Sequence, residues 1–122
     1  MTPTALLLDD ERNSEAVESL RLFQNIVTVR SVAAFKEHIT SKGLPDFIAF
    51  DFYLGMGLPT GYDAAHFLCQ HCMDNKLALP KWKVHSSSKE GALDIERLLL
   101  NFRRFKDTGA VPDVRMKHER EY

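Results

Sequence analysis

The segment Phe47-Ile48-Ala49-Phe50-Asp51 sets the architecture expected of this chain, because four apolar residues run without interruption and then stop on a carboxylate. An unbroken apolar run bounded by turn residues predicts a strand buried on both faces, as in a parallel sheet covered by helices. Pro45-Asp46 precedes the run, and a glycine-rich loop, 55–61, follows it. Open α/β sheets bind ligands at the carboxyl ends of their strands, so Asp51 stands where a ligand is expected.

The same design occurs earlier in the chain, where Ala5-Leu6-Leu7-Leu8 is followed at once by Asp9 and Asp10. The ends of two adjacent parallel strands would place Asp9, Asp10 and Asp51 in one crevice. Carboxylates repel one another, so a group of three normally requires a cation or protonation. Hard oxygen ligands suit Mg²⁺ or Mn²⁺, which also accept phosphate oxygens. The sequence therefore predicts a divalent-metal and phosphate site, with ordinary loop acids and helix caps as the alternative.

Residues around the first predicted strand indicate two helices and one further strand. Asn13-Ser14 offers an N-cap, and apolar residues at helical spacing predict an amphipathic helix over about 13–24. The β-branched segment 26–29 predicts a short strand. Ser31 then caps a second helix, which Gly43 ends.

Residues after the glycine-rich loop predict a third helix, an edge strand and a fourth helix. The third helix opens at 60–63, and Pro80 stops that segment. Residues 81–85 alternate polar and apolar side chains, which is typical of a strand at or near a sheet edge. Ser87 and Glu90 have capping-box spacing at the start of the fourth helix. The βαβαβαβα alternation favours a three-layer, doubly wound α/β fold with a parallel sheet.

Composition bounds the size and class of the protein. The 122 residues fit one domain over 1–122, with a core at about 5–105 and a tail at 107–122. Hydrophobic residues make up 44% and charged residues 27%, values close to those of globular proteins in water, which argues against disorder and membrane spanning. A formal net charge of -1 gives no general attraction for nucleic acid or for a membrane surface.

The chain has two cysteines, Cys69 and Cys72, which fall within one predicted helix. This spacing suits core packing better than a zinc site, a redox site or a disulfide framework. The first residues lead straight into a predicted strand, so no signal peptide is expected. We therefore predict a cytoplasmic location.

Four segments in order, Leu6 to Arg12, Phe50-Asp51, Pro59 to Asp63 and Val84 to Ser86, resemble the receiver domain of bacterial response regulators. More closely, they resemble the atypical family described as cyclic-phosphate processing receiver domains, whose small members suit a bacterial or phage genome. The resemblance spans about residues 5–105. It implies a receiver-like, flavodoxin-like sheet reduced to four principal strands in spatial order 2-1-3-4.

The resemblance also implies roles at the matched positions. The implied metal ligands, for Mg²⁺ or Mn²⁺, are Asp9, Asp10, Asp51 and the backbone carbonyl of Tyr53. Asp51 matches the acid that receives phosphate in receivers, and Ser86 matches the hydroxyl that contacts the phosphoryl group. With His85, which matches the histidine before that serine, these form the candidate catalytic group.

Phosphate contacts are expected at the start of the fourth helix, where Ser86 and Ser87 are followed by Ser88 and Lys89. Free backbone N–H groups and the helix dipole attract an anion there, and Lys89 adds positive charge. The resemblance adds Arg12, which follows the acidic pair. Plain helix capping by the serines is the alternative, and a serine–lysine nucleophile is the less favoured one.

The chain departs from both patterns in two places. The atypical family usually continues from its central acid through a histidine and a second acid, whereas this chain has Phe52 and Tyr53. A fifth strand ending in lysine, as in ordinary receivers, is not evident after the fourth helix. Three functions remain open: a metal-dependent domain that hydrolyses or binds a cyclic phosphate or nucleotide-derived ligand, a receiver switch phosphorylated on Asp51, and a degenerate receiver fold that binds a protein partner.

Overall fold

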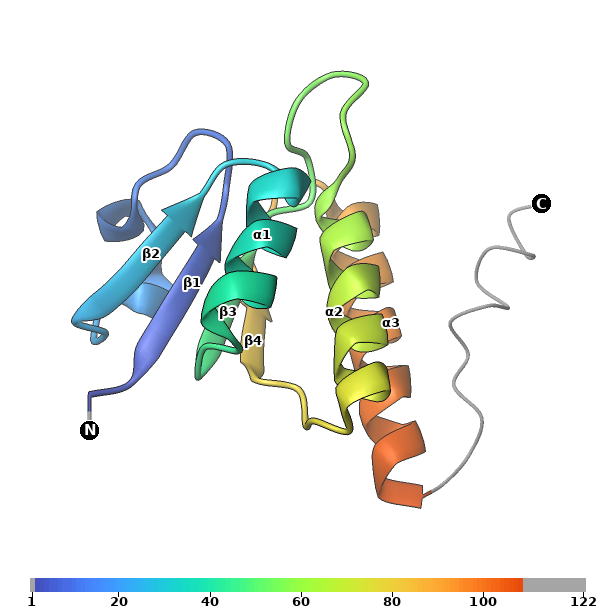
Figure 1. Ribbon diagram of the computed structural model, residues 1–122. Helices are drawn as coiled ribbons and strands as arrows, with labels where there is room; N and C mark the ends of the chain where they lie inside the picture. Colours follow the sequence, from blue (N-terminus) through green and yellow to red (C-terminus); the bar gives the residue numbers. More distant parts are fainter. Residues whose placement is uncertain (1, 109–122) are drawn as a thin grey trace.

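The computed structural model describes residues 2–108 and contains a four-stranded parallel sheet in the order β2-β1-β3-β4 (Figure 1). The strands are β1 (Thr4–Leu8), β2 (Asn25–Val29), β3 (Phe47–Phe50) and β4 (Lys81–Val84). The α-helices are α1 (Val32–Lys42), α2 (Gly61–Asn75) and α3 (Lys89–Thr108). This arrangement confirms the predicted α/β class and strand order.

The two central strands are buried on both faces, as their apolar runs predict. Leu6 and Leu7, which point to opposite faces of β1, both have no solvent exposure. The register sets Leu6 beside Ile48 and Leu8 beside Phe50, so Asp9 and Asp51 leave their strands at the same level.

All three α-helices cover one face of the sheet (Figure 1). The core on that face combines Leu6, Leu8, Ile48 and Phe50 of the sheet with Phe35 and Ile39 of α1, Leu68 of α2, and Leu99 and Phe102 of α3. Cys69 and Cys72 are buried in the same core, as predicted. Burial, followed by the charge of Cys72, raises the pKa of Cys69 to about 12, so this thiol is unreactive at neutral pH.

The opposite face is covered by two short 3₁₀ turns, η1 (Ser14–Ala16) and η2 (Glu18–Leu20), where the sequence predicted one helix over about 13–24. That prediction is wrong. Val17 is extended between the turns, and Asn13 makes no side-chain cap. Val17 and Leu20, three residues apart, are buried against Ala5, Leu7 and Ala49. A three-residue spacing matches one turn of 3₁₀ helix as well as it matches an α-helix.

The caps of the three α-helices within residues 2–108 follow the sequence with one exception. The Ser31 hydroxyl accepts a hydrogen bond from the Ala34 N–H, and Gly43 ends α1 at a positive φ of 87°. Thr60 and Asp63 form a capping box on α2. At α3 the cap is Ser88, whose hydroxyl accepts from the Gly91 N–H at 3.1 Å, so the predicted role of Ser87 is wrong.

Strand β4 has a sheet neighbour only on its β3 side within the described residues, which agrees with the predicted edge position. Helix α3 continues through Thr108, so it enters the predicted tail, and the rest of that tail lies outside the described residues. No helix within residues 2–108 is both long and apolar enough to cross a bilayer.

Candidate functional site

Backbone hydrogen bonds beyond the strand ends fix the positions of the candidate site residues. The Asp9 N–H donates to the Val29 carbonyl at 3.1 Å, and the Asp51 N–H donates to the Leu8 carbonyl at 2.9 Å. The His85 N–H donates to the Phe50 carbonyl at 2.8 Å. The sheet ladder therefore extends one residue past each strand and holds these side chains at one edge.

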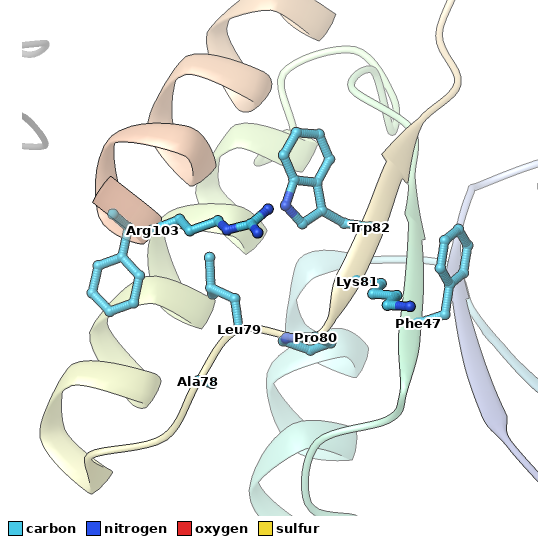
Figure 2. A pocket seen from close by; sticks show the side chains of 8 residues that line it. Phe47, Ala78, Leu79, Pro80, Lys81, Trp82 and Arg103 are labelled. Atoms are coloured by element: carbon cyan, nitrogen blue, oxygen red, sulfur yellow. The ribbon is translucent and has the colours of Figure 1, made fainter. Parts of the chain in front are cut away.

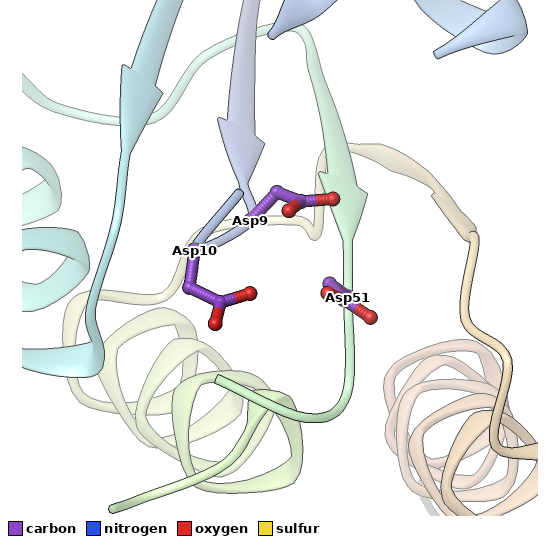
Figure 3. Close-up of side chains that lie close together, drawn as sticks. All are labelled: Asp9, Asp10 and Asp51. Atoms are coloured by element: carbon purple, nitrogen blue, oxygen red, sulfur yellow. The ribbon is translucent and has the colours of Figure 1, made fainter. Parts of the chain in front are cut away.

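The three acids predicted from the sequence come together at that edge (Figure 3). Asp9, Asp10 and Asp51 each offer a carboxylate oxygen, and these atoms lie within 4.8 Å of one another. Asp9 is buried, with 1% exposure, whereas Asp10 and Asp51 are partly exposed. Oxygen donors at this spacing, with access to water, fit a hard divalent cation.

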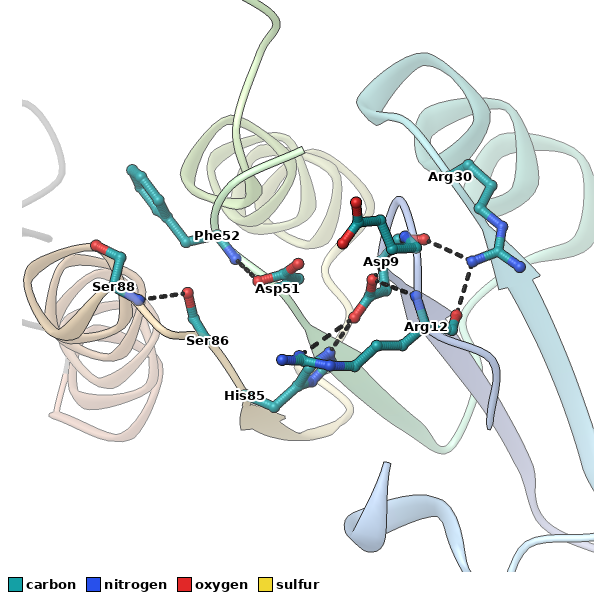
Figure 4. A network of polar contacts seen from close by, with 9 residues as sticks. Asp9, Arg12, Arg30, Asp51, Phe52, His85, Ser86 and Ser88 are labelled. Carbon is teal, nitrogen blue, oxygen red and sulfur yellow. Dashed lines mark hydrogen bonds and ion pairs between the residues drawn. The ribbon is translucent and has the colours of Figure 1, made fainter. Parts of the chain in front are cut away.

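Asp9 is held by contacts to both of its oxygens (Figure 4). Oδ1 accepts from the backbone N–H groups of Glu11 and Arg12, at 2.9 and 2.8 Å. Oδ2 lies 2.9 Å from Nε2 of His85 and 3.6 Å from a guanidinium nitrogen of Arg12. Within the described residues, Asp9 is therefore held at both carboxylate oxygens.

These surroundings move the pKa values of two of the acids in opposite directions. Burial acts to raise the pKa of Asp9, but the N–H groups of Arg12 and Glu11 and the His85 ring outweigh it, so the pKa falls. Burial raises the pKa of Asp51, and the negative charge of Asp9 raises it further. A nearby positive charge would therefore stabilise the ionised form of Asp51.

Arg30 is a site residue that the sequence reasoning missed. One guanidinium nitrogen donates to the backbone carbonyls of Asp9 and Arg12, at 3.2 and 2.7 Å (Figure 4). The other nitrogen donates to Oδ1 of Asn13 at 2.8 Å. Arg30 directly follows β2, the strand beside β1. A cation just past a neighbouring strand was the signal that could have found it.

Phe52 and Ser86 lie on either side of the Asp51 end of the site (Figure 4). The Phe52 N–H donates to Oδ1 of Asp51 at 2.8 Å, and its ring packs against α3 at Gly91, where a Cβ would collide with it. The hydroxyl of Ser86 accepts from the Ser88 N–H at 3.1 Å. Phe52, which replaces the histidine usual in the atypical family, therefore joins the end of β3 to the start of α3.

Three further predicted residues, Tyr53, Ser87 and Lys89, lie in the segments that follow β3 and β4. Tyr53 follows in the loop, with its side chain 51% exposed. Lys89 is exposed in the first turn of α3, and no ion pair connects it to an acid within the described residues. Ser87 is exposed and lines a hollow together with His85 and Ser86.

A cavity of about 700 Å³ lies at the opposite end of the sheet, beside the first residues of β3 and β4 (Figure 2). Trp82 and Arg103 line it, together with Phe47, Leu79 and Pro80. Phe47 and Lys81 are the first residues of their strands, so this cavity is remote from Asp51, which follows the last residue of β3.

Comparisons with solved structures agree with this architecture. The signal receiver domain of a putative Luxo repressor protein from Vibrio parahaemolyticus is 18% identical, with a TM-score of 0.54 over 99% of this chain and 97% of that chain. A LuxR-family response regulator from Aurantimonas sp. SI85-9A1 is 17% identical, with a TM-score of 0.53 and full coverage of both chains. The MaeR response regulator bound to beryllium trifluoride is 14% identical, with a TM-score of 0.53 and full coverage of both. At these identities the likeness establishes the fold.

No curated protein matches the sequence. The family described as "Cyclic-phosphate processing Receiver domain" matches residues 4–101, which include all four strands and the whole acidic cluster. The chain therefore belongs to this family of receiver domains.

Proposed function

We propose that this protein is a metal-dependent phosphate-handling domain, which binds or hydrolyses a cyclic phosphate or a nucleotide-derived ligand. The observation that supports it most directly is the grouping of Asp9, Asp10 and Asp51, whose carboxylate oxygens lie within 4.8 Å of one another at two adjacent strand ends. The family description points to the same class of ligand. The phosphate ester is thus the small-molecule partner.

The three acids, with the backbone carbonyl of Tyr53, would hold Mg²⁺ or Mn²⁺. When bound, such a cation neutralises the carboxylates and polarises a phosphoryl oxygen. Arg12 is 46% exposed beside Asp9, so its guanidinium can meet a ligand as well as that carboxylate. Ser86, Ser87 and Lys89 would supply further phosphate contacts at the start of α3.

His85 has two roles in this proposal. Its Nε2 contact with Asp9 orients the carboxylate, and its Nδ1 is buried without a hydrogen-bond partner among the described residues. The ring can therefore exchange a proton with a ligand only after Nε2 leaves Asp9. Asp51 and Ser86 would contact the phosphoryl group next to the His85 ring.

A receiver switch phosphorylated on Asp51 is the second candidate. Asp51 directly follows β3 and has a partly exposed carboxylate, and the MaeR structure shows a protein of this fold with beryllium trifluoride bound. The phosphoryl group would then remain on the protein and change its surface for a protein partner.

One experiment separates these functions. Nucleoside 2′,3′-cyclic phosphates are incubated with the protein and Mg²⁺ and followed by ³¹P NMR, and beryllofluoride is added to a parallel sample. Metal-dependent turnover that Asp51→Asn abolishes is the expected result. Glu37→Gln, which removes an exposed acid on α1, should retain it. Capture of beryllofluoride without turnover or binding of the cyclic phosphates would favour the switch, and silence in both assays would favour a protein-binding module.

A further inference from the structure

A second hollow, of about 650 Å³, adjoins the acidic cluster. Arg12, Glu18 and Ser19 form one wall, and Lys83, His85 and Ser86 form the other. It lies between the 3₁₀ turns and the end of β4, on the sheet face without α-helices. The volume falls within the range of about 300–1,000 Å³ typical of small-molecule sites. We call this hollow the Lys83 groove.

The Lys83 groove and the acidic cluster share a boundary. Arg12 and His85 line the groove, and both also reach Oδ2 of Asp9, at 3.6 and 2.9 Å. Figure 4 shows these two side chains converging on that carboxylate. A ligand whose phosphate meets the cluster can therefore extend past Arg12 into the groove.

The polar groups of the groove suit an oxyanion. Arg12 and Lys83 bring two positive charges against the single acid Glu18 among the lining residues. Arg12 also lies 3.6 Å from Asp9, whereas Lys83 forms no ion pair within the described residues, so Lys83 is the cation open to a ligand. The hydroxyl oxygen of Ser19 is buried with no hydrogen-bond partner in the described part of the chain, and it can donate to a ligand oxygen.

We propose that the Lys83 groove is a second anion subsite, which selects phosphate esters carrying a further phosphate on the same molecule. This inference rests on the proposed function, because it assigns the first phosphate to the acidic cluster. Lys83 is the specificity-determining residue, and Arg12 lies between the two subsites.

Strand β4 supplies a matched control for Lys83. Lys81 and Lys83 are two residues apart and pair with Phe47 and Ala49, so both side chains point to the same sheet face. Both are exposed. Lys81 lies at the amino end of the strand and does not line the groove, so Lys81→Ala removes an equal charge without touching the subsite.

The test compares adenosine 2′,3′-cyclic phosphate with its 5′-phosphorylated form, in the presence of Mg²⁺. Dissociation constants are measured by titration, or KM values if the ligand is turned over. Wild type should prefer the 5′-phosphorylated form by about two- to fivefold, a range that corresponds to exposed charge pairs. Lys83→Ala should remove most of this preference, Lys81→Ala should keep it, and Glu18→Gln should increase it.

Three other results would overturn the subsite, and they differ in what they say of the function. Equal affinity of wild type for the two ligands, or equal losses in Lys81→Ala and Lys83→Ala, would refute the subsite and leave the phosphate site standing. Failure of both ligands to bind with metal present would refute both proposals. Unchanged thermal unfolding of Lys83→Ala would confirm that the variant is folded.

Discussion

Asp9 and Asp51 are neighbouring acids with opposite effects on folding, because their surroundings differ. Asp9 accepts two backbone N–H bonds and contacts His85, and these interactions favour its ionised form. Asp51 is destabilised as an anion by burial and by the charge of Asp9. We therefore expect the ionised Asp51 to destabilise the metal-free protein, and a bound cation to relieve this effect.

We therefore expect opposite pH profiles for Asp9→Asn and Asp51→Asn in the metal-free protein. The folded pKa of Asp9 is lowered, so its stabilisation is complete above the unfolded value of 3.8 and is lost as pH falls through the folded pKa. At pH 7, Asp9→Asn should lower the free energy of unfolding by about 1–3 kcal/mol. This deficit should shrink at more acidic pH.

The folded pKa of Asp51 is raised, so its penalty is present above that pKa and absent below the unfolded value of 3.8. Asp51→Asn should stabilise the protein at pH 7 and have little effect below pH 3.8. Urea unfolding with chelator present, at pH 7 and below pH 3.8, measures the free energy of unfolding of both variants. A loss of stability in Asp51→Asn at pH 7 would contradict this account.

Most of these site residues could be predicted from the sequence, because the end of each central strand is recognisable as an apolar run followed by acids. Arg30 was missed because its contacts go to backbone carbonyls and to Asn13, and its place directly after β2 was the one signal for it in the sequence. The contact of His85 with Asp9 joins residues 76 positions apart, which depends on the strand order as well as on local sequence.

The start of α2 is packed directly against the end of β3. The Gly61 N–H donates to the Phe52 carbonyl at 2.7 Å, and a Cβ at Gly61 would collide with the Asp51 carbonyl. Glycine at this position lets the helix approach the strand end, and so it helps to set where Asp51 lies.

We expect Gly61→Ala to lower the free energy of unfolding by about 1–3 kcal/mol, as overpacking against backbone does. Mg²⁺ affinity should fall as well, because Asp51 must shift. Thr60→Ala provides the control: it removes the α2 cap, at a cost of about 0.5–2 kcal/mol, without contacting Asp51. Chemical unfolding and metal titration of both variants test this. Equal Mg²⁺ affinity in Gly61→Ala and wild type would show that the contact does not position Asp51.

The α-helices and strands were predictable because periodicity and caps agreed with one another, as at Ser31 and Thr60. The segment 13–24 was not, because its buried residues Val17 and Leu20 satisfy both α and 3₁₀ spacing, and Asn13 lacks a capping bond. Packing against the sheet face selects the 3₁₀ conformation over the α-helix, and that face exists only in the folded chain.

Within residues 2–108 the three layers are unequal, with three α-helices on one face of the sheet and two 3₁₀ turns on the other. The acidic cluster joins the two central strands, since Asp9 follows β1 and Asp51 follows β3. A cation bound there would stabilise the whole fold, because the unfolded chain has no such grouping.

Thermal unfolding should therefore respond to Mg²⁺ as a global effect. At a Mg²⁺ concentration 100 times the dissociation constant, the free energy of unfolding should rise by about 2.7 kcal/mol. Asp10→Asn and Asp51→Asn should weaken this response, whereas Glu37→Gln should not, since Glu37 is an exposed acid on α1. An equal response in all four proteins would place the cation elsewhere.

Strand β4 presents its outer backbone N–H and C=O groups at the rim of the sheet, because the described residues place no strand beyond it. Such a rim can recruit a second copy of the protein, and exposed lysines are a common defence against this stacking. Lys81 and Lys83 occupy alternate positions on this strand, so their charges repel an approaching identical strand. Two requirements would thus limit which residue can occupy position 83: selection of the ligand and prevention of self-association. Random substitution at position 83 should therefore yield aggregating variants as well as unselective ones.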